Sequence, residues 1–234
     1  MPAIFGDHMV LQQGTTLPVW GSAAPGERVS VSYADRHGET VADATGRWRV
    51  TLRPIPYSTG AGIMLINGSN RIEFRDVIIG DVWICAGEGN MAFPLSEATG
   101  GKQAAALTDR GLRCFTSTSR ASSRPDAKGS GHWVVCDPET APSFPAVGFF
   151  FARDLRASRQ IPVGMINCST ADPAPIFSWM SPHASQGIAG MRGKPRTPPG
   201  AHFNGMIAPI LPYAITGVIW YQGESDEGKG AIPY

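Results

Sequence analysis

The first third of the chain alternates between apolar and polar positions, which is the period of strands with one buried face. The alternation is clear over residues 29–33 and recurs over residues 47–53 and 71–75. Turn-forming sequences separate these runs, at Ala24-Pro25-Gly26, His37-Gly38, Thr45-Gly46 and Asn67-Gly68. Short strands at this spacing predict a small β-sandwich domain over residues 1–78.

The pattern changes near residue 77, where the apolar runs become continuous. Residues 77–79 and 82–85 contain no alternating polar positions, which is typical of strands buried on both faces of a parallel sheet. We therefore place a domain boundary after residue 78. The chain is predicted to continue as a second domain over residues 79–234.

Helical and strand patterns alternate along this second domain. The elements predicted in chain order are a helix over 147–155, a strand over 161–166, a helix over 203–211 and a strand over 215–221. Gly205 and Pro209 weaken the second helix. Segments 116–131 and 181–202 are rich in Ser, Gly, Pro and basic residues, so they are predicted to be surface loops. This order favours an α/β fold with a parallel sheet and flanking helices.

Composition excludes some classes of function. The 234 residues carry a net charge of +1 and only 17% charged residues, so nothing favours binding to nucleic acid or to an anionic membrane. The apolar runs are too short to span a bilayer, and the first residues lack the basic and apolar regions of a signal peptide. The cysteines match no zinc or redox spacing, and we expect buried free thiols with at most one bridge among Cys85, Cys114, Cys136 and Cys168.

The segment from Ile84 to Met91 is the most informative about chemistry. An apolar strand runs into a turn of small residues around Gly89 and then into a segment that can be helical. A residue at such a turn lies at the carboxyl edge of the sheet, beside a helix N-terminus that stabilises negative charge. The turn therefore has the form of an esterase nucleophile turn.

Distinctive motifs recur along almost the whole chain. They cover residues 5–13, 17–21, 76–83, 84–91, 162–167, 175–179, 206–209 and 217–225. Together they resemble the sialate O-acetylesterase family, a group of SGNH-type carbohydrate esterases related to the acetylxylan esterases. The resemblance implies an SGNH-hydrolase-like sheet behind the small β-sandwich, and hydrolysis of acetyl esters on sugars by a serine nucleophile. It implies an acetylated carbohydrate as partner, with no cofactor and no metal.

The chain departs from the family's nucleophile motif, Gly-Gln-Ser-Asn-Met. Gly89 stands at the serine position and cannot form an acyl-enzyme, and Glu88 stands at the glutamine position. A glycine needed only for a tight turn explains Gly89 equally well. A carboxylate at position 88 would repel a developing oxyanion unless it were protonated. The resemblance implies oxyanion or substrate-binding roles for four positions, Glu88, Asn90, Gln222 and Glu224.

The base and a second oxyanion donor are also missing from the family pattern. The catalytic histidine of the family lies in an Asp-x-x-His motif, and none occurs in this sequence. The histidines present lie outside any motif and are expected to be surface or structural residues: His8, His37, His132, His183 and His202. Residues 171–174 replace a Gly-Gly-Thr-like turn, and Pro173 among them has no N–H to donate.

Three functions remain open on the sequence alone. The first is a carbohydrate O-acetylesterase that is impaired or inactive, or a fragment of a longer esterase. The second is a catalytically dead glycan-binding or scaffold protein, in which Trp179, Trp220 and Tyr221 stack on sugars. The third makes Glu88, Glu224 and Asp226 an acid cluster for metal or glycosidic chemistry.

The predicted strand over 215–221 would have an open edge and partly uncovered apolar faces. We therefore expect either a dimer or a further C-terminal segment beyond Tyr234. The resemblance implies a secreted, periplasmic or lysosomal protein, which the absence of a signal peptide at Met1 does not support.

Overall fold

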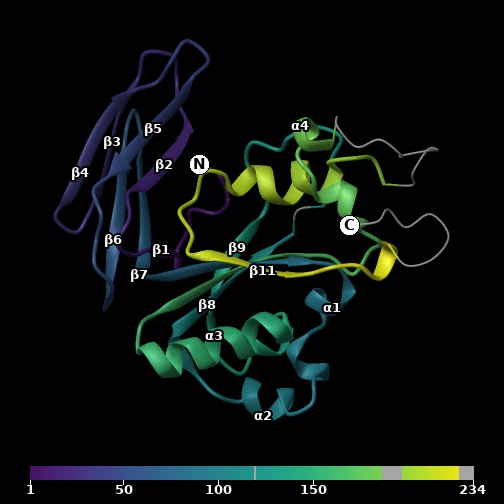
Figure 1. The fold of residues 1–234 in the computed structure, drawn as a ribbon. Coiled ribbons are helices and arrows are strands. Elements are labelled where there is room, and N and C mark those ends of the chain that lie inside the picture. The colour runs from purple at the N-terminus through teal and green to yellow at the C-terminus, as the bar shows by residue number, and fades with distance from the viewer. Residues whose placement is uncertain (119, 186–196, 227–234) are drawn as a thin grey trace.

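The computed structural model describes residues 1–118, 120–185 and 197–226 (Figure 1). The strands are β1 (Val10–Gln12), β2 (Leu17–Ser22), β3 (Arg28–Tyr33), β4 (Arg36–Val41), β5 (Arg47–Leu52), β6 (Ser58–Asn67), β7 (Arg71–Gly87), β8 (Asp109–Ser117), β9 (Gly131–Cys136), β10 (Val163–Ser169) and β11 (Gly217–Tyr221). The α-helices are α1 (Gly89–Ala92), α2 (Gly101–Ala105), α3 (Ala146–Arg159) and α4 (Pro182–Ser185). Shorter helical turns are η1 (Leu95–Glu97), η2 (Ala141–Ser143), η3 (Ile176–Trp179), η4 (Phe203–Ile207), η5 (Ala208–Ile210) and η6 (Glu224–Asp226).

The described strands form one large sheet and one small one. The nine-stranded sheet has the order β4-β3-β6-β7-β10-β8-β9, and β1 and β11 also pair with β7. β2 and β5 form the two-stranded sheet. Parallel pairing joins β7 to β10 and β11, and β10 to β8. This mixed sheet with flanking helices confirms the predicted α/β fold class, and the strands predicted near 161–166 and 215–221 are β10 and β11.

β7 passes through both parts of the chain. Its first half pairs antiparallel with β6 and parallel with β1, whereas its second half pairs parallel with β10 and β11. The runs predicted as separate strands over 71–75, 77–79 and 82–85 are therefore one strand. The division after residue 78 falls inside that strand, so the two-domain description stays a prediction.

The N-terminal strands follow the predicted alternation. β5 exposes every second residue and buries the others, and β3 buries every second residue while those between are exposed or half-buried. Val31, Val50 and Leu52 belong to one buried cluster, through which the small β2–β5 sheet packs against the antiparallel end of the large sheet. Amphipathic strands of this kind can bury only one face each, so two layers are needed to cover both apolar faces.

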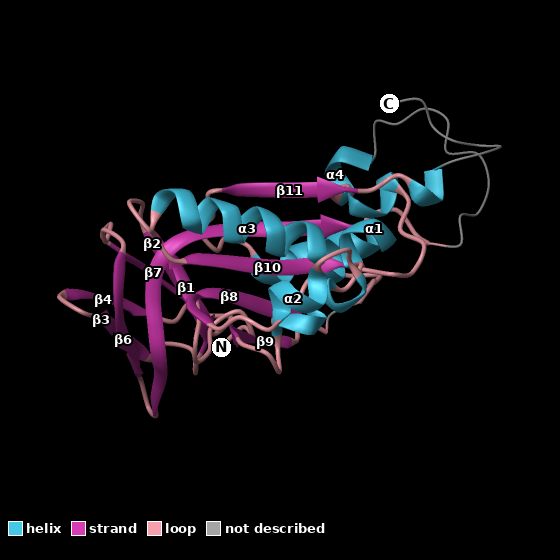
Figure 2. Ribbon diagram, turned by 90° about the horizontal axis from the view of Figure 1, so that it is seen from below, coloured by secondary structure: helices cyan, strands magenta, loops and turns pink. Residues whose placement is uncertain are grey.

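α3 covers one face of the parallel strands. It begins after Pro145, buries Ala146, Phe149 and Ala152, and ends at Gln160 in the left-handed conformation. Figure 1 shows α1, α2 and α3 on one side of these strands, with η4, η5 and α4 on the other, and Figure 2 shows α3 lying along the strands. The helix predicted over 147–155 is confirmed.

The helix predicted over 203–211 is wrong in type. η4 is a single π-helical stretch and η5 a 3₁₀ turn. A Cβ on Gly205 would lie 1.7 Å from the carbonyl oxygen of Arg120, so this position has to approach the neighbouring backbone as glycine. Pro209 lies in the first turn of η5, where its missing N–H costs no helical hydrogen bond.

Other predictions for the second half are corrected or limited. The loop predicted over 116–131 begins and ends within strands, because β8 extends to Ser117 and β9 begins at Gly131. α4 lies within the loop predicted over 181–202, of which residues 186–196 lie outside the described residues. All four cysteines are buried free thiols, so the alternative of one bridge is wrong. None of the described helices is long and apolar enough to cross a membrane.

β11 has the open edge that was predicted. Among the described residues it pairs with β7 alone. Val218, Trp220 and Tyr221 on this strand are each about half exposed.

Candidate active site

Three loops meet where parallel strands end. Residues 88–90 follow β7, residues 170–176 follow β10, and residues 222–226 follow β11. Because β10 and β11 both pair parallel with β7, these loops emerge at the same edge of the sheet. Ligands of open α/β sheets bind outside the carboxyl ends of the strands, so this edge is the candidate site.

Gly89 lies at the start of α1, on the surface, with room for a side chain. An added Cβ would find only the Glu224 Oε1 atom within 4 Å, at 3.7 Å, and the backbone is not left-handed. Gly87, two residues earlier, is different: its φ is 146° and a Cβ would lie 1.8 Å from the Tyr221 carbonyl oxygen. The turn therefore requires glycine at position 87 but not at position 89.

The Glu88 carboxylate is buried in a cradle of hydrogen-bond donors. Oε1 accepts the backbone N–H of Ala174 at 2.6 Å and also the Ser225 hydroxyl. Oε2 accepts the backbone N–H groups of Ser225 at 3.1 Å and Gly223 at 3.3 Å, and the side-chain amide of Gln222 at 3.2 Å. Glu88 thus ties the loops after β10 and β11 to the end of β7.

These hydrogen bonds keep Glu88 ionised. Burial alone would raise the pKa of its carboxyl, but the hydrogen bonds from Ser225, Ala174 and Gly223 outweigh burial and hold the pKa below its ordinary value. The residue as a whole is 2% exposed. The loops donate hydrogen bonds to the charged carboxylate and so stabilise it. The protonated form of Glu88, which would tolerate a nearby oxyanion, is therefore disfavoured.

Gln222 and Asp226 continue this network. The Gln222 side-chain amide donates to the Glu88 carboxylate, to the Ala174 carbonyl at 3.2 Å and to the Asp226 carboxylate. Asp226 also accepts the backbone N–H of Ile176 at 3.0 Å, at the start of η3. The Gln222 amide, for which the resemblance implies an oxyanion or substrate-binding role, therefore donates to acceptors within the protein.

Glu224 and Asn90 meet at the first turn of α1. Glu224 Oε1 accepts the Asn90 backbone N–H at 2.6 Å. Both residues are exposed. Glu224 thereby lies beside Gly89 and holds the first turn of α1.

Backbone donors for an oxyanion are few. The Gly89 N–H donates to no acceptor among the described residues. In the loop after β10, Asp172 N–H donates to the Thr170 hydroxyl and Ala174 N–H to Glu88, while Pro173 has none. Pro173 has no N–H to donate, and the N–H groups of both its neighbours already donate within the protein.

His202 is the histidine that sequence reasoning missed. It is 4% exposed, it stacks on Trp179 at 5.0 Å between ring centroids, and its Nδ1 lies 2.8 Å from the Ser178 hydroxyl. Ser178 donates that hydroxyl to the Pro175 carbonyl, so Nδ1 of His202 carries the proton of this pair. Burial lowers the pKa of His202, and the charges of Glu88 and Asp172 partly counter that effect. No sequence motif marks this residue.

Among the described residues, the remaining histidines form no hydrogen bond with the loops after β7, β10 and β11. His8 pairs with Asp76 and His37 with Glu39, both in the N-terminal part. His132 lies in β9 and His183 in α4, and both are exposed. They are surface or structural residues, as predicted.

A polar cavity of about 500 Å³ lies beside the loop after β10. Its lining includes Ser117 from the end of β8, Thr170 and Asp172 from the loop after β10, and His202. Gly89 and Glu88 do not line it. The cavity therefore does not contain the nucleophile position.

The proposed acid cluster lacks the form of a metal site. Glu88, Glu224 and Asp226 each accept backbone N–H groups. Across the described parts of the chain, no group of three or more His, Cys, Asp or Glu side chains is arranged to hold a metal ion. The carboxylates at this edge fasten loops, and the third sequence hypothesis has no support in their contacts.

Comparison with known proteins places this fold and site in context. No family model matches the chain. Sialate O-acetylesterases from Homo sapiens and Pongo abelii are 26% identical to it over 94% of this chain and 47% of their own length. A carbohydrate acetylesterase from Xanthomonas citri, known by crystal structure, superposes with a TM-score of 0.88 and 35% identity, over 97% of this chain and 51% of that protein.

The fold is thus that of a carbohydrate acetylesterase. The resemblance to the sialate O-acetylesterase family that the motifs predicted is confirmed. The chain spans about half the length of the relatives it matches.

Proposed function

We propose that this chain is a carbohydrate O-acetylesterase homologue that binds acetylated sugars at the strand-end loops and has lost serine-dependent hydrolysis. The vacant nucleophile position carries the proposal. Gly89 begins α1 where the family has its serine, and the backbone there accommodates a side chain. A glycine that the turn does not require is best explained as a lost nucleophile.

Loss of chemistry extends beyond the nucleophile. Covalent catalysis needs a base beside the attacking hydroxyl, and enzymes stripped of the triad retain about 10³–10⁴-fold acceleration from binding and the oxyanion hole alone. Here Asp172 and Ala174 use their N–H groups internally, and Glu88 places a buried negative charge next to the site. These features remove most of the remaining oxyanion stabilisation.

Features suited to sugar binding remain at the same edge. The Gly89 N–H has no acceptor among the described residues and can donate to an acetyl carbonyl. Trp220 and Tyr221, at the end of β11, are 44% and 47% exposed. Exposed aromatic faces next to free donors are typical of carbohydrate sites. Trp179 does not share this role, since it is buried against His202.

Acetate release tests the proposal. We expect the unmodified chain to release no acetate from acetylated xylan or from O-acetylated sialic acid. Gly89→Ser and Gly89→Ala are expected to fold like the wild type, because the nearest atom to an added Cβ is 3.7 Å away. Both variants should also be inactive, since the one carboxylate near position 89, Glu224, accepts the Asn90 backbone N–H, and no histidine of the described residues lies within 4 Å of a Cβ there. The Gly89→Ala variant controls for the added side chain without a hydroxyl.

Each outcome bears on a different part of the proposal. Acetate release by the wild type would overturn it and show a mechanism that needs no serine. Release by Gly89→Ser but not by Gly89→Ala would establish position 89 as the lost nucleophile and contradict the absence of a base. A second substitution, His202→Gln in the serine background, would then show whether the buried imidazole is that base. Saturable binding of acetylated xylo-oligosaccharides without turnover is the result we expect.

A further inference from the structure

Asparagine followed by glycine occurs twice in the chain, at Asn67-Gly68 and at Asn204-Gly205. The two pairs have opposite surroundings. Asn67 is exposed and ends β6, and residues 68–70 connect it to β7. Asn204 is 4% exposed and lies within η4. The same dipeptide is therefore open to water in one place and enclosed by the protein in the other.

An asparagine side chain can lose ammonia by reaction with its own backbone. The backbone nitrogen of the next residue gives up its proton and bonds to the side-chain carbonyl carbon, while the bond from that carbon to the amide nitrogen breaks. Ammonia leaves, and the product is a succinimide ring. A water molecule then opens the ring at either carbonyl, which gives aspartate or isoaspartate. Glycine as the next residue favours the ring closure, because it has no Cβ and few conformational restrictions.

The Asn67 side chain is available for this reaction. Its amide makes no hydrogen bond with any described residue, although its backbone pairs with Ser30 on β3 and Arg71 on β7. The Gly68 N–H donates to the Asn70 carbonyl at 2.9 Å, a hydrogen bond confined to the turn. Exposed turns open locally at little cost in free energy, whereas core elements open only at a cost close to that of global unfolding. The attacking nitrogen is therefore released by an opening of the turn alone.

The turn requires glycine at position 68 because of Glu27. Glu27 Oε1 accepts the Ser69 backbone N–H at 2.6 Å, and Oε2 accepts the Ala24 backbone N–H at 3.0 Å. These hydrogen bonds, Ser69 foremost, lower the pKa of Glu27, so its carboxylate is charged at neutral pH. A Cβ on Gly68 would lie 2.4 Å from Glu27 Oε1. Any larger residue would displace the carboxylate, so the turn retains the neighbour that makes Asn67 reactive.

Asn204 lacks this freedom. Its backbone N–H donates to the Gly200 carbonyl at 2.8 Å, and its carbonyl accepts the Asp126 backbone N–H at 2.9 Å. Its side-chain amide donates to the Ser122 carbonyl at 3.4 Å. Burial also keeps away the water that opens the ring. Asn204 therefore serves as a reference within the same chain, with the same dipeptide in a protected place.

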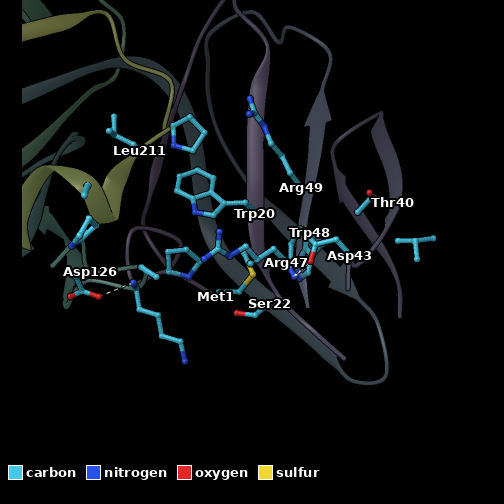
Figure 3. A pocket seen from close by; sticks show the side chains of 18 residues that line it. Met1, Trp20, Ser22, Thr40, Asp43, Arg47, Trp48, Arg49, Asp126 and Leu211 are labelled. Carbon is cyan, nitrogen blue, oxygen red and sulfur yellow. Dashed lines mark hydrogen bonds between the residues drawn. The ribbon is translucent and has the colours of Figure 1, made fainter. Parts of the chain in front are cut away.

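The segment that Glu27 anchors leads to the wall of a cavity. The Glu27 carbonyl accepts the Ala42 backbone N–H at 2.9 Å, and Asp43, the next residue, closes a turn by accepting the Arg47 backbone N–H at 3.0 Å. Asp43 and Arg47 line a cavity of about 700 Å³, together with other residues of the β2–β5 sheet and with residues 125–128 and 211–212 (Figure 3). A change at the turn after β6 therefore reaches this wall through Glu27.

We propose that Asn67 is a site of spontaneous deamidation in the folded protein, with water as the co-reactant. The product carries a new carboxylate in the same turn as Ser69, whose N–H binds the Glu27 carboxylate. Like charges repel each other, and isoaspartate also lengthens the backbone at the Asn67–Arg71 pair. Both changes weaken the hydrogen bond between Ser69 and Glu27. The candidate active site takes no part, so the modification is independent of the proposed function.

Peptide mapping of the whole chain, aged in mildly alkaline buffer, tests this site. We expect Asn67 to convert to aspartate and isoaspartate at least about tenfold faster than Asn204, because the turn opens far more easily than the core. In urea, where both pairs are unfolded, the two asparagines should convert at similar rates. Equal rates in the folded protein, or an Asn67 that stays intact there, would overturn the proposal.

Two variants and one further measurement locate the reaction and its effect. Asn67→Gln should abolish the acidic form that ageing produces on ion exchange, because glutamine would have to form a larger ring. Asn70→Gln, at the exposed asparagine of the same turn, should leave the conversion of Asn67 unchanged. Amide hydrogen exchange at Ser69 and Ala24 should be faster in the separated acidic form than in fresh protein. An acidic form that persists in Asn67→Gln, or unchanged exchange at both amides, would contradict the proposal.

Discussion

Replacing Glu88 with glutamine is expected to destabilise the protein by about 2–4 kcal/mol, although glutamine is the family's residue at this position. The Glu88 carboxylate accepts five hydrogen bonds, all from the loops after β10 and β11. A glutamine amide accepts only through its oxygen, and its NH₂ group would face N–H donors. Buried donors would then be left without acceptors, and the three loops would lose their common anchor.

The effect should depend on pH in a defined direction. Hydrogen bonds hold the pKa of Glu88 below its ordinary value despite burial, which alone would raise it. A group with a depressed pKa contributes stability above its unfolded pKa, about 4.3 for glutamate, and loses that contribution as pH falls through its folded pKa. Urea unfolding should therefore give the largest difference between wild type and Glu88→Gln at neutral pH, and a shrinking one below about pH 4.

Glu224→Gln provides the matched control for that measurement. Glu224 is exposed and accepts a single backbone N–H, from Asn90. Its replacement should cost about 1 kcal/mol or less. Equal losses for the two variants, or a Glu88→Gln difference that persists unchanged in acid, would show that the buried carboxylate does not hold the loops together.

The spacing of apolar residues predicted the strands and the helix that bury one face. The alternation of β3 and β5 and the helical spacing of α3 come from local patterns, so they were accessible from sequence. β8 was not predicted, because the buried Arg113 interrupts its apolar positions. The continuity of β7 was hidden in the same way by Asp76 and Asp81. Such polar residues become buried only when distant partners satisfy them.

The candidate site was predictable in position but not in contacts. The motif around Gly89 identified the end of β7 as the nucleophile turn, and the structure places it at the start of α1. The donors to Glu88 lie 86 to 137 residues away in sequence, so no local pattern could assign them. His202 belongs to no motif, and its contacts with Trp179 and Ser178 arise only in the folded chain. Its proximity to Glu88 is a property of the tertiary fold.

Arg113→Leu is expected to cost about 3–5 kcal/mol, because it removes one partner of a buried ion pair. The Arg113 side chain is 2% exposed, and its Nη2 lies 3.0 Å from the Asp76 carboxylate. It also donates to the backbone carbonyls of His8, Arg110 and Asp76. His8 and Asp76 both have left-handed backbones, with φ of 66° and 54°. This conformation is unfavourable for residues other than glycine, and the hydrogen bonds from Arg113 hold both residues in it.

Arg110→Leu separates this effect from general loss of charge. Arg110 Nη2 lies 3.7 Å from the same Asp76 carboxylate, but its side chain is 73% exposed, so its removal should change stability by about 0.5 kcal/mol or less. Urea unfolding of both variants measures the difference, and equal stabilities would contradict the role given to Arg113.

Since β7 runs through both parts of the chain and Arg113 binds it at Asp76, the wild type should unfold in one transition. Arg113→Leu should move the midpoint of that transition without splitting it.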